Sequence, residues 1–131
     1  MKRLVLFVAV VGLITMAACN KDQAAVKDLS GNWLIKTIDG TDIPFDSALT
    51  VTFDKCKLKK DEWCTATVAY KPGDSTSTTE YKVIDDGTTL VQREPGATLE
   101  LESTITELTN ESLTLTTTLF GITTVATYDK K

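Results

Sequence analysis

From residue 31 onward, apolar and polar residues alternate along the chain with a period of two. In residues 48–54, Leu49, Val51 and Phe53 alternate with polar threonines, which is typical of a strand with one buried and one exposed face. The same pattern predicts eight strands, at residues 32–38, 48–54, 63–70, 79–85, 88–94, 98–104, 112–120 and 122–129. Turn residues separate them, including Asp39-Gly40, Asp86-Gly87 and Pro95-Gly96. Asp-Gly between two strands indicates a tight hairpin.

These strands predict an all-β fold, an up-and-down antiparallel barrel or a barrel-like meander. The chain after residue 18 holds 22 threonines, and β-branched residues favour strands over helices. No long stretch with a helical period occurs there. Short connections join strands that are neighbours in the sequence, and closing eight of them into a barrel removes exposed edges. Residues 105–112 fit either one helical turn or a hairpin with Asn110 at its tip.

The first 18 residues have the organisation of a secretory signal peptide. Lys2 and Arg3 are followed by an uncharged apolar run, residues 4–18. A basic start, a short apolar run and small residues at the end define such a leader. The run is shorter than the roughly 20 residues that cross a bilayer as a helix. A permanent membrane anchor or a core helix is the alternative, which the polar residues 20–28 disfavour.

The segment Met16-Ala17-Ala18-Cys19 resembles the lipobox of bacterial lipoproteins, where small residues precede a cysteine that is lipidated and becomes the first residue. The resemblance implies that Cys19 is a lipid attachment site. One acyl chain binds membranes reversibly, whereas several hold firmly. We therefore expect a lipidated polar tether at residues 19–28 and one β domain at residues 29–131. The expected location is the cell envelope, on the outer membrane, facing the periplasm or the surface.

The net charge excludes one class of partner. The leader holds two of the 14 basic residues, so 12 remain against 18 acidic residues, a net charge of −6. Nucleic-acid binding requires a basic face for the phosphates. The sequence therefore predicts no nucleic-acid partner, and membrane contact only through the lipid anchor.

Cys56 and Cys64 flank a short charged connection between two predicted strands. An exported protein meets an oxidising compartment, where thiols tend to pair. We expect a structural disulfide, which for so short a loop contributes about 2.5 kcal/mol. A redox or metal-binding pair is the alternative; the spacing of eight and the absence of histidine from the chain disfavour it.

Residues 29–40, LSGNWLIKTIDG, resemble the opening of the lipocalin or calycin superfamily, where a Gly-x-Trp motif begins the first barrel strand. Gly31 and Trp33 match that motif. In the family this tryptophan packs across the closed end of the barrel, so the resemblance implies that Trp33 is buried and structural. Residues 105–117, ITELTNESLTLTT, resemble strand pairs of bacterial lipocalin-like lipoproteins. Together they imply a lipocalin-like lipoprotein.

The residue types present argue against catalysis. Without histidine, the Ser-His and Cys-His nucleophile pairs and His-ligated zinc are excluded. Glu100 and Glu102 alternate with leucines, which places them on the outer face. Asp85-Asp86-Gly87 lacks the further oxygen ligands of a calcium loop, and the basic residues 56–62 read as a soluble turn. We expect no catalytic residue, no metal site and no cofactor.

Two functional classes remain. The barrel is either a module that holds a small apolar molecule in its mouth, or an interaction or inhibitor module that binds an envelope protein through its rim loops. Fold alone does not choose between them. Large inward side chains that fill the barrel disfavour a ligand, and small inward side chains favour one. The sequence prediction is an envelope-anchored, non-catalytic binding module, with an apolar ligand as the first hypothesis.

Overall fold

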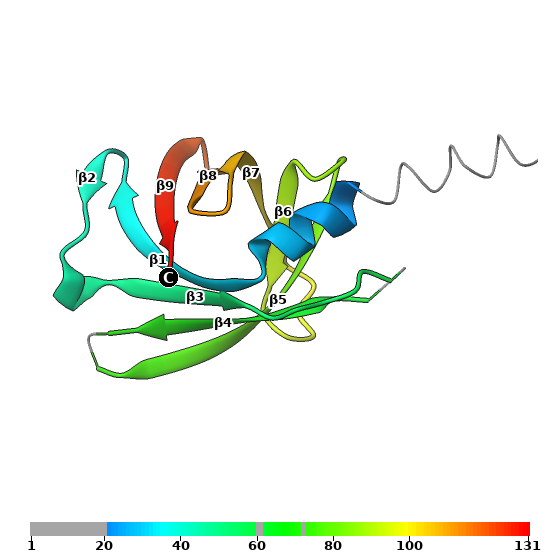
Figure 1. Cartoon of the computed structure of the whole chain (residues 1–131), viewed down its shortest axis with the longest axis horizontal. Helices are drawn as coiled ribbons and strands as arrows, with labels where there is room; N and C mark the ends of the chain where they lie inside the picture. The colour runs from blue at the N-terminus through cyan, green and yellow to red at the C-terminus, as the bar shows by residue number, and fades with distance from the viewer. Residues whose placement is uncertain (1–20, 60–61, 72) are drawn as a thin grey trace, which may run out of the picture.

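The computed structural model describes residues 21–59, 62–71 and 73–131 (Figure 1). The predicted leader and the predicted lipidation site Cys19 lie outside the described residues. More than half of the described residues form one antiparallel sheet that curves round on itself, with a single α-helix packed against one end.

Eight strands close into a barrel, which confirms the predicted all-β, up-and-down fold. Neighbouring strands in the sheet follow the chain order, and β1 also pairs with β9, which closes the ring. The barrel strands are β1 (Gly31–Ile38), β3 (Leu49–Phe53), β4 (Cys64–Tyr70), β5 (Ser75–Ile84), β6 (Thr89–Arg93), β7 (Leu101–Leu108), β8 (Ser112–Leu119) and β9 (Ile122–Lys130). The two-residue strand β2 (Thr41–Asp42) folds back on the end of β1, and the 3₁₀ helix η1 (Phe45–Ser47) leads into β3.

The strands differ from the prediction mainly in two places. β5 begins at Ser75, inside a Ser/Thr run between the predicted strands 63–70 and 79–85, because Ser75–Thr79 pair with β4 and extend the hairpin. β7 runs to Leu108, beyond the predicted end at residue 104, so of the two alternatives for residues 105–112 the hairpin is confirmed and the helical turn is wrong. In both places, pairing with a neighbouring strand decides the conformation of a segment whose own pattern is weak.

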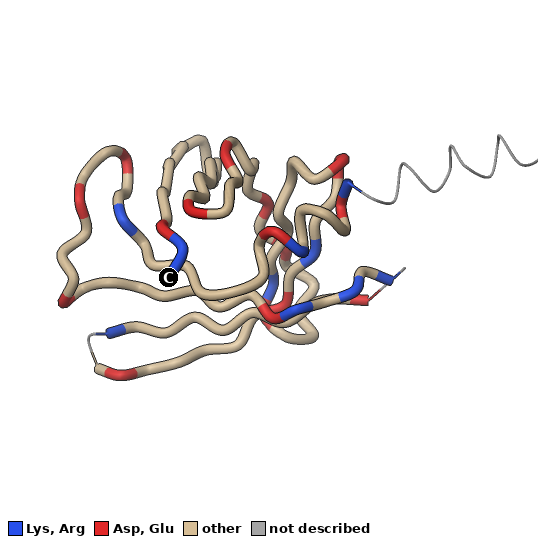
Figure 2. Tube along the Cα trace, in the orientation of Figure 1, with Lys and Arg blue, Asp and Glu red and all other residues tan. Residues whose placement is uncertain are grey.

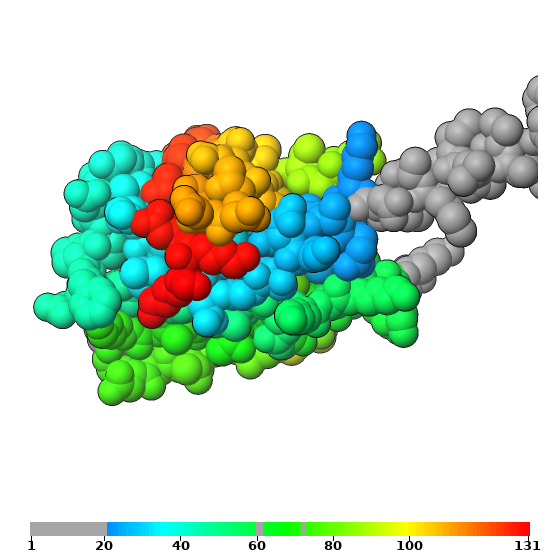
Figure 3. Space-filling view, in the orientation of Figure 1, coloured from blue at the N-terminus to red at the C-terminus, as the bar shows by residue number. Residues whose placement is uncertain are grey.

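The expected flexible tether is wrong over residues 21–28: residues 21–29 form a helix. Ala25, Val26 and Leu29 lie on one face of it and are buried in the barrel core. So short a helix is marginal in isolation, and packing stabilises it. In Figure 3 it lies flush with the body of the protein. The folded domain therefore begins before residue 29.

The helix defines a closed end of the barrel. It shares that end with the 54–63 connection and with the β5–β6 and β7–β8 turns. The helix, this connection and the β5–β6 turn lie to the right in Figure 1. The β1–β2–η1 connection, the β4–β5 turn, the β6–β7 loop and the β8–β9 turn lie at the opposite, open end. The largest fully buried side chains are Trp33, Tyr81, Leu29, Leu90, Leu113, Val26 and Val91.

Candidate functional site at the open end of the barrel

The Gly31-x-Trp33 motif lies at the closed end, where its two residues meet the last strand. Trp33 is 0% exposed, and its indole Nε1 donates a hydrogen bond of 2.7 Å to the carbonyl of Leu29, at the end of the helix. Lys130 of β9 places its Nζ 5.1 Å from the centre of the Trp33 ring. A Cβ on Gly31 would approach Lys130 Cε to 3.1 Å, and Gly31 has φ of +120°. Both motif residues therefore have a packing role here.

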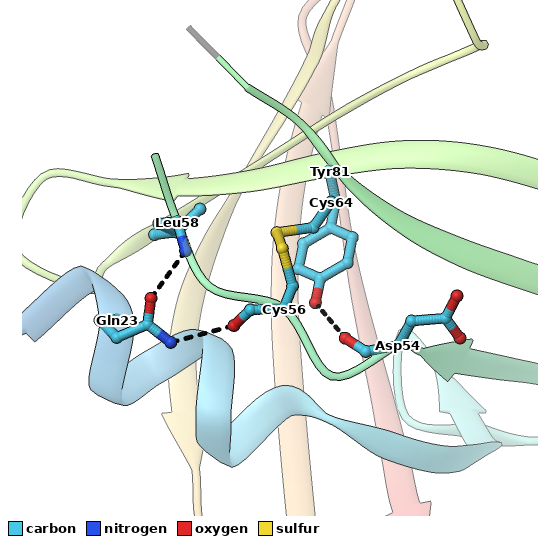
Figure 4. Close-up of a disulfide and its surroundings, with 6 residues drawn as sticks. All are labelled: Gln23, Asp54, Cys56, Leu58, Cys64 and Tyr81. Atoms are coloured by element: carbon cyan, nitrogen blue, oxygen red, sulfur yellow. Dashed lines mark hydrogen bonds between the residues drawn. A yellow bond between two sulfur atoms is a disulfide. The ribbon is translucent and has the colours of Figure 1, made fainter. Parts of the chain in front are cut away.

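The cysteine pair also stabilises the closed end. Cys56 and Cys64 form a disulfide, with their Cα atoms 5.8 Å apart (Figure 4). The side chain of Gln23, from the helix, accepts a hydrogen bond from Leu58 N at 2.7 Å and donates one to the Cys56 carbonyl at 3.0 Å. The disulfide and the helix thus hold the same connection from two sides.

Tyr81 of β5 links this connection to the core. Its ring lies edge-on against Phe53, with the centroids 4.9 Å apart, and its hydroxyl donates to the carbonyl of Asp54 at 3.0 Å. Burial raises the pKa of Tyr81 to about 12, and the charge of Asp54 adds to the shift. Burial likewise raises the pKa of Tyr128, with a further contribution from Tyr70. Both tyrosines stay neutral at physiological pH. Tyr81 packs in the core and donates a hydrogen bond, and Tyr128 packs against the core.

Inward side chains change in kind along the barrel. Near the helix they are large, as Trp33 and Tyr81 are. Toward the open end, alternation along the strands turns both apolar and small or hydroxylated side chains inward. The apolar ones include Leu49, Val68 and Tyr70. The small or hydroxylated ones are Ser75, Ser77, Thr79, Ser103, Thr117, Thr124 and Ala126. Ser103 and Thr117 join their hydroxyls at 2.6 Å, whereas Thr79 Oγ1 is buried and has no partner among the described residues. The closed half is filled by large side chains, and the open half has a mixed lining of small polar and apolar side chains.

Large hydrophobic side chains gather at the rim of the open end. In the described part of the chain, the exposed ones are Ile38, Phe45, Tyr70, Leu99, Leu101, Leu119, Phe120 and Ile122, and all of them lie on connections or strand ends of this rim. Single exposed hydrophobics are ordinary on a protein surface. A concentration at one end indicates a surface that binds something.

The β8–β9 turn carries the most exposed of these side chains. Phe120 is 94% exposed and has φ of +51°. Among the described residues, the other non-glycine positions with positive φ are Asp39, Asp74, Asp85 and Asp86, and aspartate tolerates this conformation far better than an aromatic residue does. The backbone at Phe120 therefore stores strain, and such strain tends to occur at functional positions.

A groove of about 380 Å³ lies on the outer wall beside the rim. Leu34, Thr50, Ala69 and Thr76 are cross-strand neighbours on β1, β3, β4 and β5, and they line its floor. Aromatic side chains of Phe45 and Tyr70 line it as well, together with Ala48, Lys71, Asp74, Ser75 and Lys131. The volume falls within the range of small-molecule sites. Because four strands contribute one outward residue each, no local motif in the sequence announces the groove.

The acidic residues that could have formed a catalytic carboxylate pair or a calcium loop are on the surface. Glu100, Glu102, Asp85 and Asp86 are exposed. The described residues contain no group of three or more His, Cys, Asp or Glu side chains that could hold a metal ion. Among those same residues, no helix is both long and apolar enough to span a membrane.

No protein-family model matches the chain, and neither the curated proteins nor the solved structures contain a significant match to it.

Proposed function

We propose that this protein is a lipocalin-like lipoprotein of the bacterial cell envelope, anchored through Cys19, and that its barrel is a non-catalytic module that binds a small apolar molecule at the open end. The observation that carries the ligand proposal is the coincidence of two features. The exposed hydrophobic side chains of the described residues gather at one rim, and the groove of about 380 Å³ opens beside that rim.

The groove suits an apolar ligand with a polar group. Phe45, Tyr70 and Leu34 supply apolar and aromatic surface, and Thr50 and Thr76 supply hydroxyls on the floor. Ligand sites are mostly apolar, with a few polar groups that fix the orientation of the ligand. Lys71 at the edge, with its Nζ over the Phe45 ring, adds a positive charge for an acidic head group.

Native mass spectrometry of the protein purified from its own envelope tests whether it carries a bound small molecule. In parallel, the purified protein is titrated with N-phenylnaphthylamine, an uncharged apolar fluorescent probe. The variant Ala69→Arg places a long charged side chain on the groove floor without touching the core. We expect it to weaken probe binding about tenfold, the equivalent of 1.4 kcal/mol.

The matched control is Thr67→Arg, on the same outward face of β4 but outside the groove lining. It should bind the probe like the parent protein. Equal affinity of Ala69→Arg and the parent protein would remove the groove from the proposal.

The lipid anchor has its own test. Cells given a fatty-acid probe should label the parent protein and leave Cys19→Ala unlabelled, because the acyl chains attach to this thiol in the lipoprotein family that the leader resembles. Equal labelling of the two forms would contradict the anchor and leave the ligand proposal untouched.

A further inference from the structure

The β8–β9 turn projects beyond its neighbours as a two-stranded finger, residues 118–124. On one side, pairing of β8 with β7 ends at Ser103↔Thr117. On the other, pairing of β9 with β1 ends at Ile38↔Ala126. Pairing between β8 and β9 continues to Leu119↔Ile122. The finger is thus a paired hairpin end that extends beyond the last barrel pairings on both sides, and Asp39 forms hydrogen bonds with the backbone of Val125 at its base.

Apolar side chains occupy the tip of the finger. Leu119, Phe120 and Ile122 are 52%, 94% and 69% exposed, and the hydroxyls of Thr118 and Thr123 pair across its base at 2.9 Å. Such exposure shows that Phe120 does not stabilise the fold by burial, and its positive φ costs free energy. A turn of this kind is best formed by Asn-Gly or Asp-Gly. Phe120 is therefore unfavourable for the turn itself, which points to a role outside the molecule.

A rigid aromatic side chain at a protruding tip has the properties of an interface anchor. Aromatic residues that enter a pocket on the partner contribute much of the binding energy of protein interfaces. Their large area and few rotatable bonds limit the entropy lost on binding. A finger that is already ordered before binding reduces that loss further.

The charge around the finger distinguishes between three possible binding partners: a membrane surface, a second copy of the chain and a different protein. The connections that form this rim, residues 39–48, 71–74, 94–100 and 120–121, contain six acidic residues and one basic residue, Lys71. Figure 2 shows acidic positions on the neighbouring β1–β2 turn and none at the tip itself. An anionic membrane surface would repel this rim, and so would the same rim of a second copy. A protein pocket with basic edges is complementary to it.

We propose that Leu119, Phe120 and Ile122 form an anchor that inserts into an apolar pocket, edged by Lys and Arg, on a protein partner in the envelope. This site goes beyond the ligand proposal and does not depend on it, because no residue of the finger lines the groove. It assigns the strain at Phe120 to partner binding.

The first experiment places the photo-crosslinking amino acid p-benzoylphenylalanine at position 120 or at position 99 of the full chain, expressed in its own cells. Leu99 is 85% exposed on the β6–β7 loop of the same rim and belongs neither to the finger nor to the groove. We expect a specific adduct from position 120 that is absent or much weaker from position 99. The adduct is identified by mass spectrometry, and the partner is then purified.

The second experiment titrates the purified partner with the parent protein, Phe120→Asn and Leu99→Asn. Phe120→Asn should weaken binding by about tenfold or more and at the same time raise Tm by about 4 °C, because Asn tolerates the turn conformation. Leu99→Asn should change neither quantity. Salt should slow association with the parent protein, since complementary charges steer it.

Four results would overturn the proposal. A lower Tm for Phe120→Asn would make Phe120 structural. Unchanged partner affinity, or the absence of a specific adduct at position 120, would remove the anchor. Adducts between two copies of the chain would make the finger a self-association element. Loss of binding to phosphatidylcholine vesicles in Phe120→Asn, without loss of a protein partner, would make it a membrane contact. Binding of N-phenylnaphthylamine to the groove is measured on the same variants and should not change. A failure of the anchor proposal can therefore be told apart from a failure of the ligand proposal.

Discussion

The two ends of the barrel use hydrophobic residues in opposite ways. At the closed end, Trp33, Val26 and Leu29 are completely buried, and a helix, a disulfide and side-chain hydrogen bonds surround them. At the open end, side chains of similar size, such as Phe120 and Leu99, face solvent. The first arrangement stabilises the fold by removing apolar area from water. The second contributes little to folding, so its apolar area is available for binding.

The contrast predicts that changes at the closed end reduce stability and leave binding intact, with the largest effect at Trp33. Truncating a buried tryptophan leaves a cavity and costs about 3–5 kcal/mol, and Trp33→Ala also leaves the Leu29 carbonyl without its donor. Urea unfolding followed by circular dichroism measures the free energy of unfolding.

The control for this prediction is Trp63→Ala. Trp63 is only partly buried, beneath the cationic groups of Arg93 and Lys82 at 4.0 and 4.3 Å, so its loss should cost clearly less. If Trp33→Ala unfolds like the parent protein while a ligand or partner is lost, Trp33 belongs to a binding site and the comparison between the ends fails.

The disulfide should have the next largest effect. Replacing Cys56 and Cys64 together by serine should lower the free energy of unfolding by about 2.5 kcal/mol, because the unfolded chain regains the entropy of the opened loop. The same urea titration measures it. Intact-mass analysis after alkylation without reductant should find both thiols of the parent protein unmodified; two added alkyl groups would refute the bridge in solution.

Gln23 tests whether the helix holds the 54–63 connection. Gln23→Ala removes two hydrogen bonds, to the Cys56 carbonyl and from Leu58 N, each worth about 1 kcal/mol. The free energy of unfolding should fall by about 1–2 kcal/mol, and hydrogen exchange in residues 54–59 should become faster. Lys27→Ala, on the exposed face of the helix, should change neither the free energy of unfolding nor the hydrogen exchange. Equal effects of the two variants would contradict the role of Gln23 in holding the 54–63 connection.

The raised pKa of Tyr81 predicts that the folded protein loses stability in alkali. Its pKa is about 12 in the folded protein against about 10 for an unperturbed tyrosine, so the folded state retains the proton that the unfolded chain releases. The free energy of unfolding is therefore unaffected by this group below pH of about 10 and falls as the pH rises from about 10 to about 12. Urea titrations at several alkaline pH values measure the slope, which should be smaller in Tyr81→Phe. An unchanged slope would assign the loss to other groups.

The smallest effect is expected at the open end. Leu99→Ser replaces a side chain that is 85% exposed, so the free energy of unfolding should change by less than about 0.5 kcal/mol. A thermal melt is sufficient to check it. A loss as large as that of Gln23→Ala would show that the rim contributes to the fold and would erase the difference between the two ends.

The sequence was sufficient to predict the barrel, because a period of two in hydrophobicity survives in most strands. Alternation of Leu49, Val51 and Phe53 with threonines reports directly which face is buried. The Ser75–Thr79 segment of β5 carries no such contrast, and only its partner strand makes it a strand. The 21–29 helix was missed because Ala25, Val26 and Leu29 cover too few turns to establish a helical period.

The candidate site was less predictable than the fold. The groove joins single outward residues from four strands, and their proximity depends on the register of the sheet. The finger did leave a signal in the sequence: Phe120-Gly121 stands where a hairpin turn ordinarily has Asn-Gly or Asp-Gly. That substitution becomes informative only once the structure shows that Phe120 has a positive φ and is exposed.

The docked helix also limits how a lipid anchor at Cys19, as proposed above, would orient the molecule. Lys21 is already part of the helix, with its carbonyl beside Gly87 of the β5–β6 turn, and two residues of chain reach no more than about 7 Å. Acyl chains on Cys19 would therefore hold the closed end close to the lipid head groups, because the connecting segment is so short. The groove and the finger would point away from the anchoring leaflet, into the aqueous space from which a ligand or a partner arrives.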